Sequence, residues 1–516
     1  MTPLLRKIFV REASYGARSV IRVGVAWLLL VSLCIAAPLD IGSRRELFVD
    51  DFLVDRMENL SFEFHTPRKA EVVFEFNAPW EGSSSAYVTI FKDGSFYRMY
   101  YRAVEGNAPA SGEGWVMNTC YAMSEDGIRW KRPHLGLYEF KGSKENNIVW
   151  PGKGPGRWDT PVSNFAVFRD TNPDCPPSER YKALGGTFGF AHAGYLLGYQ
   201  GFVSSDGVRW RQLDGYLIDK RHWPEHSDEA SIPVFWSEYE KQYVAFIRVR
   251  VDDKLQPMDS WNPKSIRWFA KTTSKDFRNW TPLVKLDYGD APIEHFYTVA
   301  VVPYFRAPHH YIGLPMRILP ERTAKIAGFA GEAIGTGMTD TVLITSRNGV
   351  DFTRRFLESY IRPGRDRLNW TDRNTMAATG VVETGLDEIS LYITEHHRLP
   401  TNRVRRCVLR PDGFVSVRAS YAGGELVTKP IRFRGKKLNL NVSTSAAGGV
   451  RVEMLDANSE PIPGFAFKDA IELVGDSTDQ GVAWRGGDDV SSLSEKPVRL
   501  RFVLKDADLF AFQFTE

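Results

Sequence analysis

The sequence predicts an all-β protein, a five-bladed β-propeller followed by a C-terminal β-sandwich. A phrase recurs about every 60 to 80 residues, which is typical of a repeat architecture. Short apolar, β-branched and aromatic segments with Asp-Gly turns precede each copy. After Tyr421 alternating segments continue without the phrase. The predicted boundaries are 1–37 for a signal peptide, 44–420 for the propeller and 421–516 for the sandwich.

Each copy of the phrase places Asp or Asn, usually followed by Gly, before an aromatic residue. The copies are Ser124-Glu-Asp126-Gly127-Ile-Arg-Trp130, Ser204-Ser-Asp206-Gly207-Val-Arg-Trp210, Ser274-Lys-Asp276-Phe277-Arg-Asn-Trp280, Ser346-Arg-Asn348-Gly349-Val-Asp-Phe352 and Pro411-Asp412-Gly413-Phe414. Asp-Gly supplies a tight turn between the two outer strands of a blade. The phrase resembles the Asp-box of sialidases, itself a turn motif, with one residue fewer between Asp and Trp. We therefore predict a structural role for it and count five blades from its copies.

The expected strands follow one another within each repeat. By residue number they cover 86–91, 96–101 and 119–123; 164–168, 181–184 and 199–203; 232–236, 242–247 and 266–270; 297–302, 311–314 and 341–345; and 376–382, 389–393 and 404–409. The sandwich is expected to use 438–442, 450–454, 471–474 and 498–503. Alternation of apolar and polar residues in these segments favours antiparallel sheets.

The N-terminus has the pattern of an export signal. Five basic residues precede an apolar stretch, 23–37, that ends in small residues and is short for a spanning helix. We therefore predict an exported, periplasmic or extracellular protein. Only Cys120, Cys175 and Cys407 follow this segment, too few for a disulfide framework, and no zinc-binding spacing appears.

The composition gives no sign of a nucleic-acid partner and is compatible with a sugar ligand. Lysine and arginine number 66 against 63 acidic residues, so the charge gives no sign of a nucleic-acid partner. Nor does the sequence indicate a membrane partner beyond the export signal, and it makes no prediction of oligomeric state. Aromatic residues form 13% of the chain, which suits both packing between sheets and stacking on sugars.

The residues just before each innermost strand are expected to line one end of the central channel, which we call the mouth. Carboxylates, aromatics, His and Arg recur there in successive blades. They are Trp80, Glu81, Trp158, Asp159, Asn164, His226, Asp228, Glu229, Asp290, Glu294, His295, Trp370, Asp372, Arg373 and Asn374.

Converging carboxylates suit glycoside hydrolysis, which needs one protonated acid and one ionised partner. We predict Glu294 as the acid, because His295 and nearby rings would desolvate it. Asp228 is the predicted ionised partner and Glu81 a third, ring-orienting carboxylate. The predicted substrate-binding residues are Trp80, His295, Trp370, Asp372, Arg373 and Asn164. No cofactor and no metal site are predicted; a channel cation would be compatible with His295, but the sequence does not support one.

The chain resembles the invertase, arabinanase and levansucrase superfamily of glycoside hydrolases in its blade ends and trailing sandwich. It is more closely similar to uncharacterised exported planctomycete-type proteins that are labelled glycosyl-hydrolase-like. The matching segments are Glu46-Leu-Phe-Val-Asp-Asp51, Ala78-Pro-Trp-Glu-Gly82, Gly142-Ser-Lys-Glu-Asn-Asn147 and Leu286-Asp-Tyr-Gly-Asp290. The superfamily has catalytic Asp residues in blades one and two and an acid Glu in blade three. Here blade one carries Glu81 and blade three carries Asp228 with Glu229, so no role is transferred.

Three hypotheses of function follow. The first is an exported glycoside hydrolase acting on a poly- or oligosaccharide by carboxylate acid/base chemistry. The second is a non-catalytic glycan-binding propeller, which needs no pair of carboxylates at a hydrolytic separation. The third is a sialidase-like hydrolase, which would need three arginines at the mouth, of which the sequence supplies only Arg373 clearly.

Overall fold

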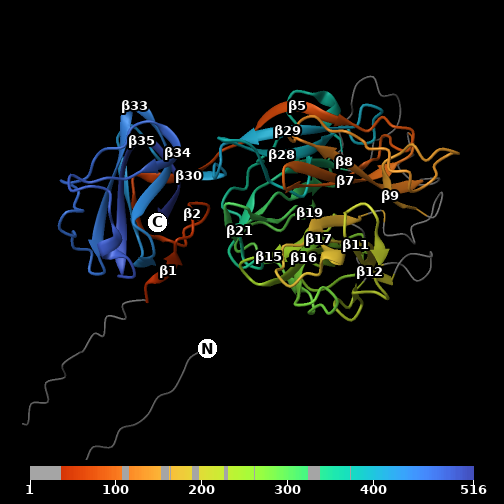
Figure 1. The fold of residues 1–516 in the computed structure, drawn as a ribbon, viewed down its shortest axis with the longest axis horizontal. Coiled ribbons are helices and arrows are strands. Elements are labelled where there is room, and N and C mark those ends of the chain that lie inside the picture. Colours follow the sequence, from red (N-terminus) through yellow and green to blue (C-terminus); the bar gives the residue numbers. More distant parts are fainter. Residues whose placement is uncertain are drawn as a thin grey trace, which may run out of the picture. The chain divides into compact units, whose positions relative to one another are not determined.

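The computed structural model is all-β in the part of the chain that it describes. It describes residues 37–516 except 107–115, 153–161, 163, 189–196, 226–230, 261, 323–336 and 372. Residues Pro38–Glu516 form one compact unit (Figure 1). Its described helices are three short 3₁₀ turns, Pro177–Glu179, Arg367–Asn369 and Ser491–Leu493. None of the helices so described has the length and apolar character needed to cross a membrane.

Three antiparallel sheets follow one another from residue 86 to residue 285. The first comprises β6 (Ala86–Asp93), β7 (Phe96–Val104), β8 (Met117–Ser124) and β9 (Ile148–Pro151). The second comprises β10 (Ala166–Arg169), β11 (Tyr181–Phe188), β12 (Leu197–Ser204), β13 (Arg211–Gln212) and β14 (Ile218–Asp219). The third comprises β15 (Val234–Ser237), β16 (Gln242–Val251), β17 (Ile266–Ser274) and β18 (Val284–Lys285).

The next repeat is divided between two small sheets. One comprises β19 (His295–Thr298), β22 (Met316–Leu319) and β23 (Met338–Thr341), and the other β20 (Val302–Tyr304), β21 (Ala307–Gly313), β24 (Ile344–Ser346) and β25 (Phe352–Thr353). The last repeat forms a sheet of β26 (Met376–Ala377), β27 (Val382–Gly385), β28 (Glu388–Glu395) and β29 (Arg403–Leu409). Its outer strand is β5 (Arg68–Glu75), from near the other end of the chain.

A ten-stranded sheet joins both ends of the described chain. It comprises β1 (Leu39–Gly42), β2 (Glu46–Leu47), β3 (Val54–Glu58), β4 (Leu60–Phe64), β30 (Val415–Ala419), β31 (Gly424–Thr428), β32 (Ile431–Phe433), β33 (Lys437–Asp456), β34 (Asp476–Gly481) and β35 (Val498–Thr515). The predicted boundaries placed 44–64 with the N-terminal domain, whereas these strands pair with β30, β31 and β35. Sequence order alone does not reveal such pairing, because the partners lie several hundred residues apart. The number of blades and the sandwich layers stay predictions.

The repeated phrase is confirmed as a turn motif. In the first copy Asp126 Oδ1 accepts hydrogen bonds from the backbone N–H groups of Ile128 and Arg129, at 2.9 and 2.8 Å. Trp130 Nε1–H donates to the Gly127 carbonyl at 3.1 Å, and Gly127 adopts a φ of 73°. These bonds to the ionised carboxylate hold the pKa of Asp126 well below its usual range.

Tyrosines on neighbouring sheets anchor these turns. Tyr100 on β7 donates to the Gly207 carbonyl, and Tyr392 on β28 donates to the Gly127 carbonyl, each at 2.8 Å. The second bond links the last sheet to the first. The phrase therefore stabilises contacts between sheets as well as turns within them.

Strands from each of the repeats surround a cavity of about 430 Å³. At least two residues of each of β6, β10, β15, β20 and β27 line it, among them Ile90, Phe168, Phe235, Tyr304 and Val382. In each repeat the lining residues follow the predicted mouth residues along the chain, so this cavity is not the predicted mouth.

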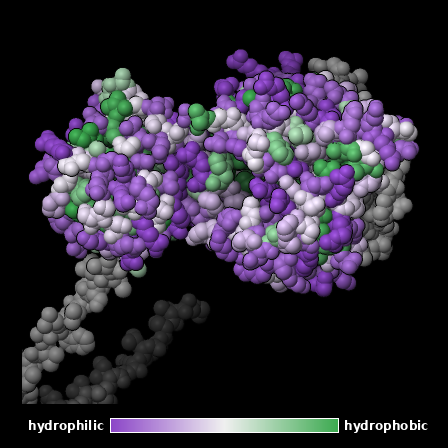
Figure 2. Space-filling model, viewed as in Figure 1, coloured by the Kyte–Doolittle hydropathy of each residue, from purple (hydrophilic) through white to green (hydrophobic). Residues whose placement is uncertain are grey.

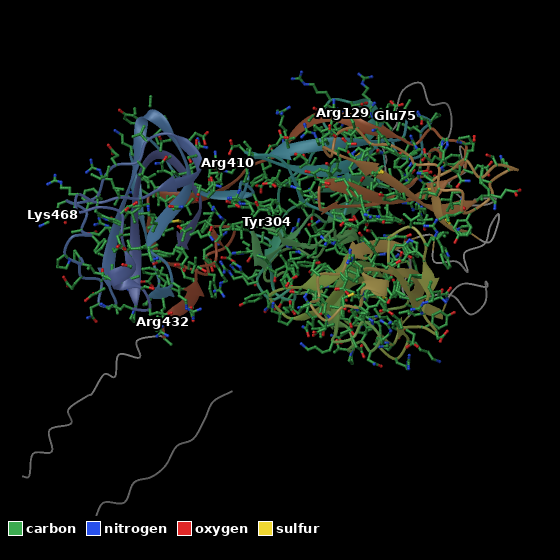
Figure 3. The ribbon with its side chains drawn as sticks, viewed as in Figure 1. Glu75, Arg129, Tyr304, Arg410, Arg432 and Lys468 are labelled. Carbon is green, nitrogen blue, oxygen red and sulfur yellow. The ribbon has the colours of Figure 1, made fainter. Side chains whose placement is uncertain are left out.

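Polar contacts connect the ten-stranded sheet to the repeats. Tyr304 donates to Asp412 Oδ1 at 2.9 Å, and Arg45 bonds the other oxygen of this buried carboxylate at 3.0 Å. Arg410 bonds Asn441 Oδ1 at 2.8 Å (Tyr304 and Arg410 are labelled in Figure 3). The face drawn in Figure 2 is mainly hydrophilic, with hydrophobic residues in small groups.

Candidate active site

The Glu81 carboxylate stabilises the loop that carries it. Its buried carboxylate accepts from Arg132 Nε and Nη2, both at 2.8 Å, from the Tyr101 hydroxyl, and from the Ala78 N–H at 3.0 Å. The neighbouring Trp80 donates from Nε1 to Asn147 Oδ1 at 2.8 Å. Burial and the adjacent Glu81 raise the pKa of Tyr101. Both carboxylate oxygens are engaged, so nothing in this geometry prepares Glu81 to contact a sugar.

Glu294 lies in an ion-pair network directly before β19. Its Oε1 is 3.1 Å from Arg317 Nη1, and its Oε2 contacts the buried Arg354. Arg317 lies opposite Phe296 in the pairing of β22 with β19 and bonds Asp340 Oδ2 at 2.6 Å. Two guanidinium groups occupy the carboxylate, whereas the predicted acid role requires an oxygen that is free to face the substrate.

His295 is held as a neutral imidazole. Its Nδ1 accepts from the Arg267 backbone N–H at 3.3 Å. Burial, with the positive charges of Arg267 and Arg250, lowers its pKa to about 4. At neutral pH this side chain is therefore a hydrogen-bonding group and carries no charge.

The remaining predicted binding residues are dispersed. Asn164 is buried and bonds both backbone groups of Gly186, with its Oδ1 accepting the N–H at 2.8 Å. Trp370 is 43% exposed and donates to the Gly364 carbonyl at 2.9 Å. Asp228 and Asp372 lie outside the described residues.

A group of arginines surrounds two tyrosines where the first strands begin. The Tyr87 and Tyr297 hydroxyl groups are 3.3 Å apart. The guanidinium carbons of Arg248, Arg373 and Arg267 lie 4.5, 5.0 and 5.7 Å from the centre of the Tyr297 ring. That of Arg102 lies 4.4 Å from the centre of the Tyr87 ring. Arg373 is thus the predicted binding residue that the structure brings to this group.

Arg398 joins this group through its effect on the buried His397. Burial lowers its pKa well below the usual value, and the positive charges of Arg373, Arg398 and Arg102 lower it further. These three positive charges therefore act on the same imidazole. We call Arg102, Arg248, Arg267, Arg373 and Arg398 the arginine cluster.

Local structure explains how the cluster forms. Arg248 is only 1% exposed and donates from Nη1 to the Tyr297 carbonyl at 2.8 Å, which ties β16 to β19. Arg102 on β7 donates to the Ser84 carbonyl at 3.0 Å. Tyr87 and Arg373 adopt φ values of 55° and 60°, in a region that side chains rarely occupy and that is often found at functional sites.

Four of the five cluster arginines do not lie among the residues before the innermost strands, where the binding residues were expected. Arg102, Arg248 and Arg267 lie on later strands of their sheets, and Arg398 on a connection between strands. The available signal was an arginine inside an apolar run, as in Phe-Ile-Arg-Val-Arg-Val over 246–251. A buried strand carries such a charge only where it meets a partner or a ligand. Cations and aromatic rings together suit the binding of an anionic group.

No family model matches the chain, and no curated protein matches it. Solved structures that it is similar to include one described as a glycoside hydrolase, at 12% identity, covering 66% of this chain and 92% of that one, with a TM-score of 0.46. A glycosyl hydrolase from Bacteroides ovatus has 13% identity, coverage of 71% and 97%, and a TM-score of 0.41. The β-1,2-mannobiose phosphorylase of Listeria innocua has 10% identity, coverage of 67% and 96%, and a TM-score of 0.43. A shared activity does not follow from these values.

Proposed function

We propose that the protein is an exported glycoside hydrolase that acts on an acidic poly- or oligosaccharide at the mouth of a five-bladed propeller. The observation that carries the proposal is the arginine cluster around Tyr87 and Tyr297. A planar guanidinium group forms paired hydrogen bonds with a carboxylate or a sulfate. An anionic sugar would therefore pair with these groups more strongly than a neutral one.

The propeller is supported by three features. Strands from each of the repeats line one cavity. The bond between Tyr392 and Gly127 links the last repeat to the first. Pairing of β5 with β29 completes the last sheet with a strand from before the first repeat, and such closure removes an exposed edge. The ten-stranded sheet is proposed as the accessory sandwich, and the apolar stretch 23–37 as the export signal.

Glu294 and Glu81 are proposed to have positioning roles instead of the predicted catalytic ones, because ion pairs occupy both carboxylates. Asp228 stays the predicted ionised partner. Glu294 is proposed to orient Arg317 and Arg354, because both guanidinium groups contact it. Glu81 is proposed to position the loop that carries Trp80.

A sialidase-like hydrolase is the second candidate, because Arg248, Arg267 and Arg373 all lie against Tyr297. A tyrosine can replace the carboxylate nucleophile in that class. Replacing Tyr297 with Phe would then abolish hydrolysis of a sialoside, whereas a carboxylate-based enzyme would retain part of its activity on its own substrate. The third candidate, a glycan-binding propeller, would bind the sugar and release no product.

The test is a screen of the full chain against uronate-containing, sulfated, sialylated and neutral polysaccharides, with binding and released reducing ends both measured. We expect binding and cleavage of an acidic polymer, with cleavage lost in Asp228→Asn and binding lost in Arg373→Gln. The control is Arg129→Gln, which removes an exposed arginine of a turn (labelled in Figure 3). Cleavage of neutral polymers alone would overturn the acidic substrate, and binding without cleavage would favour the binding propeller.

A further inference from the structure

Two histidines and a glutamate meet away from the mouth, between β2 and β21, which lie side by side (Figure 1). His309 Nε2 is 3.2 Å from Glu46 Oε1, and His310 Nε2 is 3.6 Å from Glu46 Oε2. One potential ligand atom from each residue lies within 4.8 Å of the others. All three side chains are buried, with exposed fractions of 0%, 4% and 0% for Glu46, His309 and His310.

An irregular strand brings both imidazoles to the same carboxylate. Consecutive residues of a regular strand point to opposite faces. Here the pairing of β20 with β21 shifts between Pro303 and Tyr304, so that Pro303 is opposite Tyr311 and Tyr304 is opposite Ala307. The residues between these pairs include the two histidines, whose ring centres are 4.4 Å apart. Such a bulge redirects side chains and is often found next to functional sites.

Four polar atoms of this group lack a hydrogen bond. Among the described residues, no partner satisfies Glu46 Oε1, His309 Nε2 or either ring nitrogen of His310. A buried polar atom without a partner costs about 1–3 kcal/mol. Four such atoms in one place indicate that something else binds between them.

We propose that Glu46, His309 and His310 bind a zinc ion. Two imidazole nitrogens and one carboxylate oxygen are a common zinc ligand set, which leaves a fourth position for water. Ligand atoms about 2.1 Å from a tetrahedral ion lie about 3.4 Å apart. The nitrogens of His309 and His310 lie at a comparable 3.2 and 3.6 Å from Glu46, each from a different carboxylate oxygen. Calcium and magnesium prefer oxygen ligands throughout, so two imidazoles do not suit them.

The charges around the group are compatible with a cation. Arg347 Nη1 lies 2.9 Å from Glu46 Oε2, but the same guanidinium also bonds both oxygens of Asp50, at 2.8 and 3.2 Å. Asp50 therefore balances the nearest positive charge. Arg347 then takes the place of an outer-shell donor that fixes the orientation of a ligating carboxylate. Arg44 is farther away, 3.6 Å from Glu46 Oε1, and 37% exposed to solvent.

A route for the ion leads in from the surface. A pocket of about 260 Å³ reaches His309 and Tyr239, and its lining also includes Glu238 and the arginines Arg44, Arg45 and Arg306. Tyr239 is 49% exposed and its ring centre is 5.8 Å from that of His309. A bound ion would join β2 of the ten-stranded sheet to β21 of the repeats, so its expected role is to stabilise the fold.

The test is zinc binding by the full chain after chelator treatment, followed by calorimetry and elemental analysis. We expect one zinc ion per chain, a higher Tm with zinc, and a cobalt spectrum with the intense visible bands of a tetrahedral site. Loss of an outer-shell partner lowers metal affinity about 10–100-fold, so we expect a larger loss in His310→Gln and in Glu46→Gln. The matched control is His222→Gln, which removes a histidine outside the group and should bind zinc normally.

The wild-type cobalt spectrum makes the test independent of whether a variant folds. Absence of zinc uptake and of the cobalt bands in the wild type would overturn the proposal. Equal zinc affinity in a folded His310→Gln variant would also overturn it. None of these measurements depends on glycan activity, so the zinc site and the proposed function can fail separately.

Discussion

The turns that carry the repeated phrase and the arginine cluster use charge in opposite ways. In a turn the charged group binds its own neighbours, as Asp126 binds the N–H groups of Ile128 and Arg129. In the cluster the charges come from different sheets and surround Tyr297. A sequence motif arises readily in the first case, because all the partners are local. The second leaves no motif, because its members share only their position in the fold.

The largest expected effect tests whether non-local charge pairs contribute more to stability than local ones. Glu294→Gln removes the carboxylate that contacts Arg317 and the buried Arg354. Breaking a buried ion pair is strongly destabilising, and we expect a loss of about 3 kcal/mol in the free energy of unfolding, measured with urea. The double variant Glu294→Gln with Arg354→Met should recover part of it. An unchanged unfolding midpoint in Glu294→Gln would contradict the comparison.

A smaller effect is expected on ligand binding. Arg373→Gln removes one charged hydrogen-bond donor from the cluster, and such a bond contributes about 1.5–3 kcal/mol. The Kd for an acidic oligosaccharide should therefore rise about 10–100-fold with little change in Tm. The exposed Arg129→Gln serves as control. Equal Kd changes in the two variants would show that the cluster is not the binding site.

Substitutions in the turns should lower stability by a smaller amount and leave glycan binding intact. Asp126→Ala removes the acceptor of two backbone N–H groups, and loss of a comparable capping side chain costs about 1 kcal/mol. Asp126→Asn keeps the acceptor oxygen, as Asn348 does in the fourth copy of the phrase, and should unfold like the wild type. Loss of glycan binding in Asp126→Ala, at a concentration of denaturant where it stays folded, would break the comparison.

The pH dependence of stability separates His295 from the turns. The pKa of His295 is about 4 when folded and near 6.5 when unfolded, so the unfolded chain binds the proton first and stability falls from pH 6.5 towards pH 4. The pKa of Asp276 is about 2, below its usual 3.8, so its contribution is lost only as the pH falls below about 4. His295→Asn should flatten the first slope in thermal melts and leave the second. An unchanged slope between pH 6.5 and 4 would contradict this.

The sequence predicted the strand order well because its signals are local. Asp-Gly turns and alternating apolar residues mark β6, β7 and β8 closely. It did not predict that β1 to β4 join the ten-stranded sheet, since that pairing spans several hundred residues. The site was harder for the same reason. Glu81 and Asn164 look like mouth residues in sequence, but their hydrogen bonds to Arg132 and Gly186 appear only in three dimensions.

The pairing of β5 with β29 has a consequence for the newly made chain. Arg405 bonds the carbonyl of Ala70, a residue 335 positions earlier. At roughly 5–20 residues per second, β5 waits about 17–67 s for its partner to leave the ribosome. Until then one strand at the start of the chain has unsatisfied backbone groups and invites pairing with another molecule. Protease resistance of the nascent protein should therefore appear only after β29 has been synthesised.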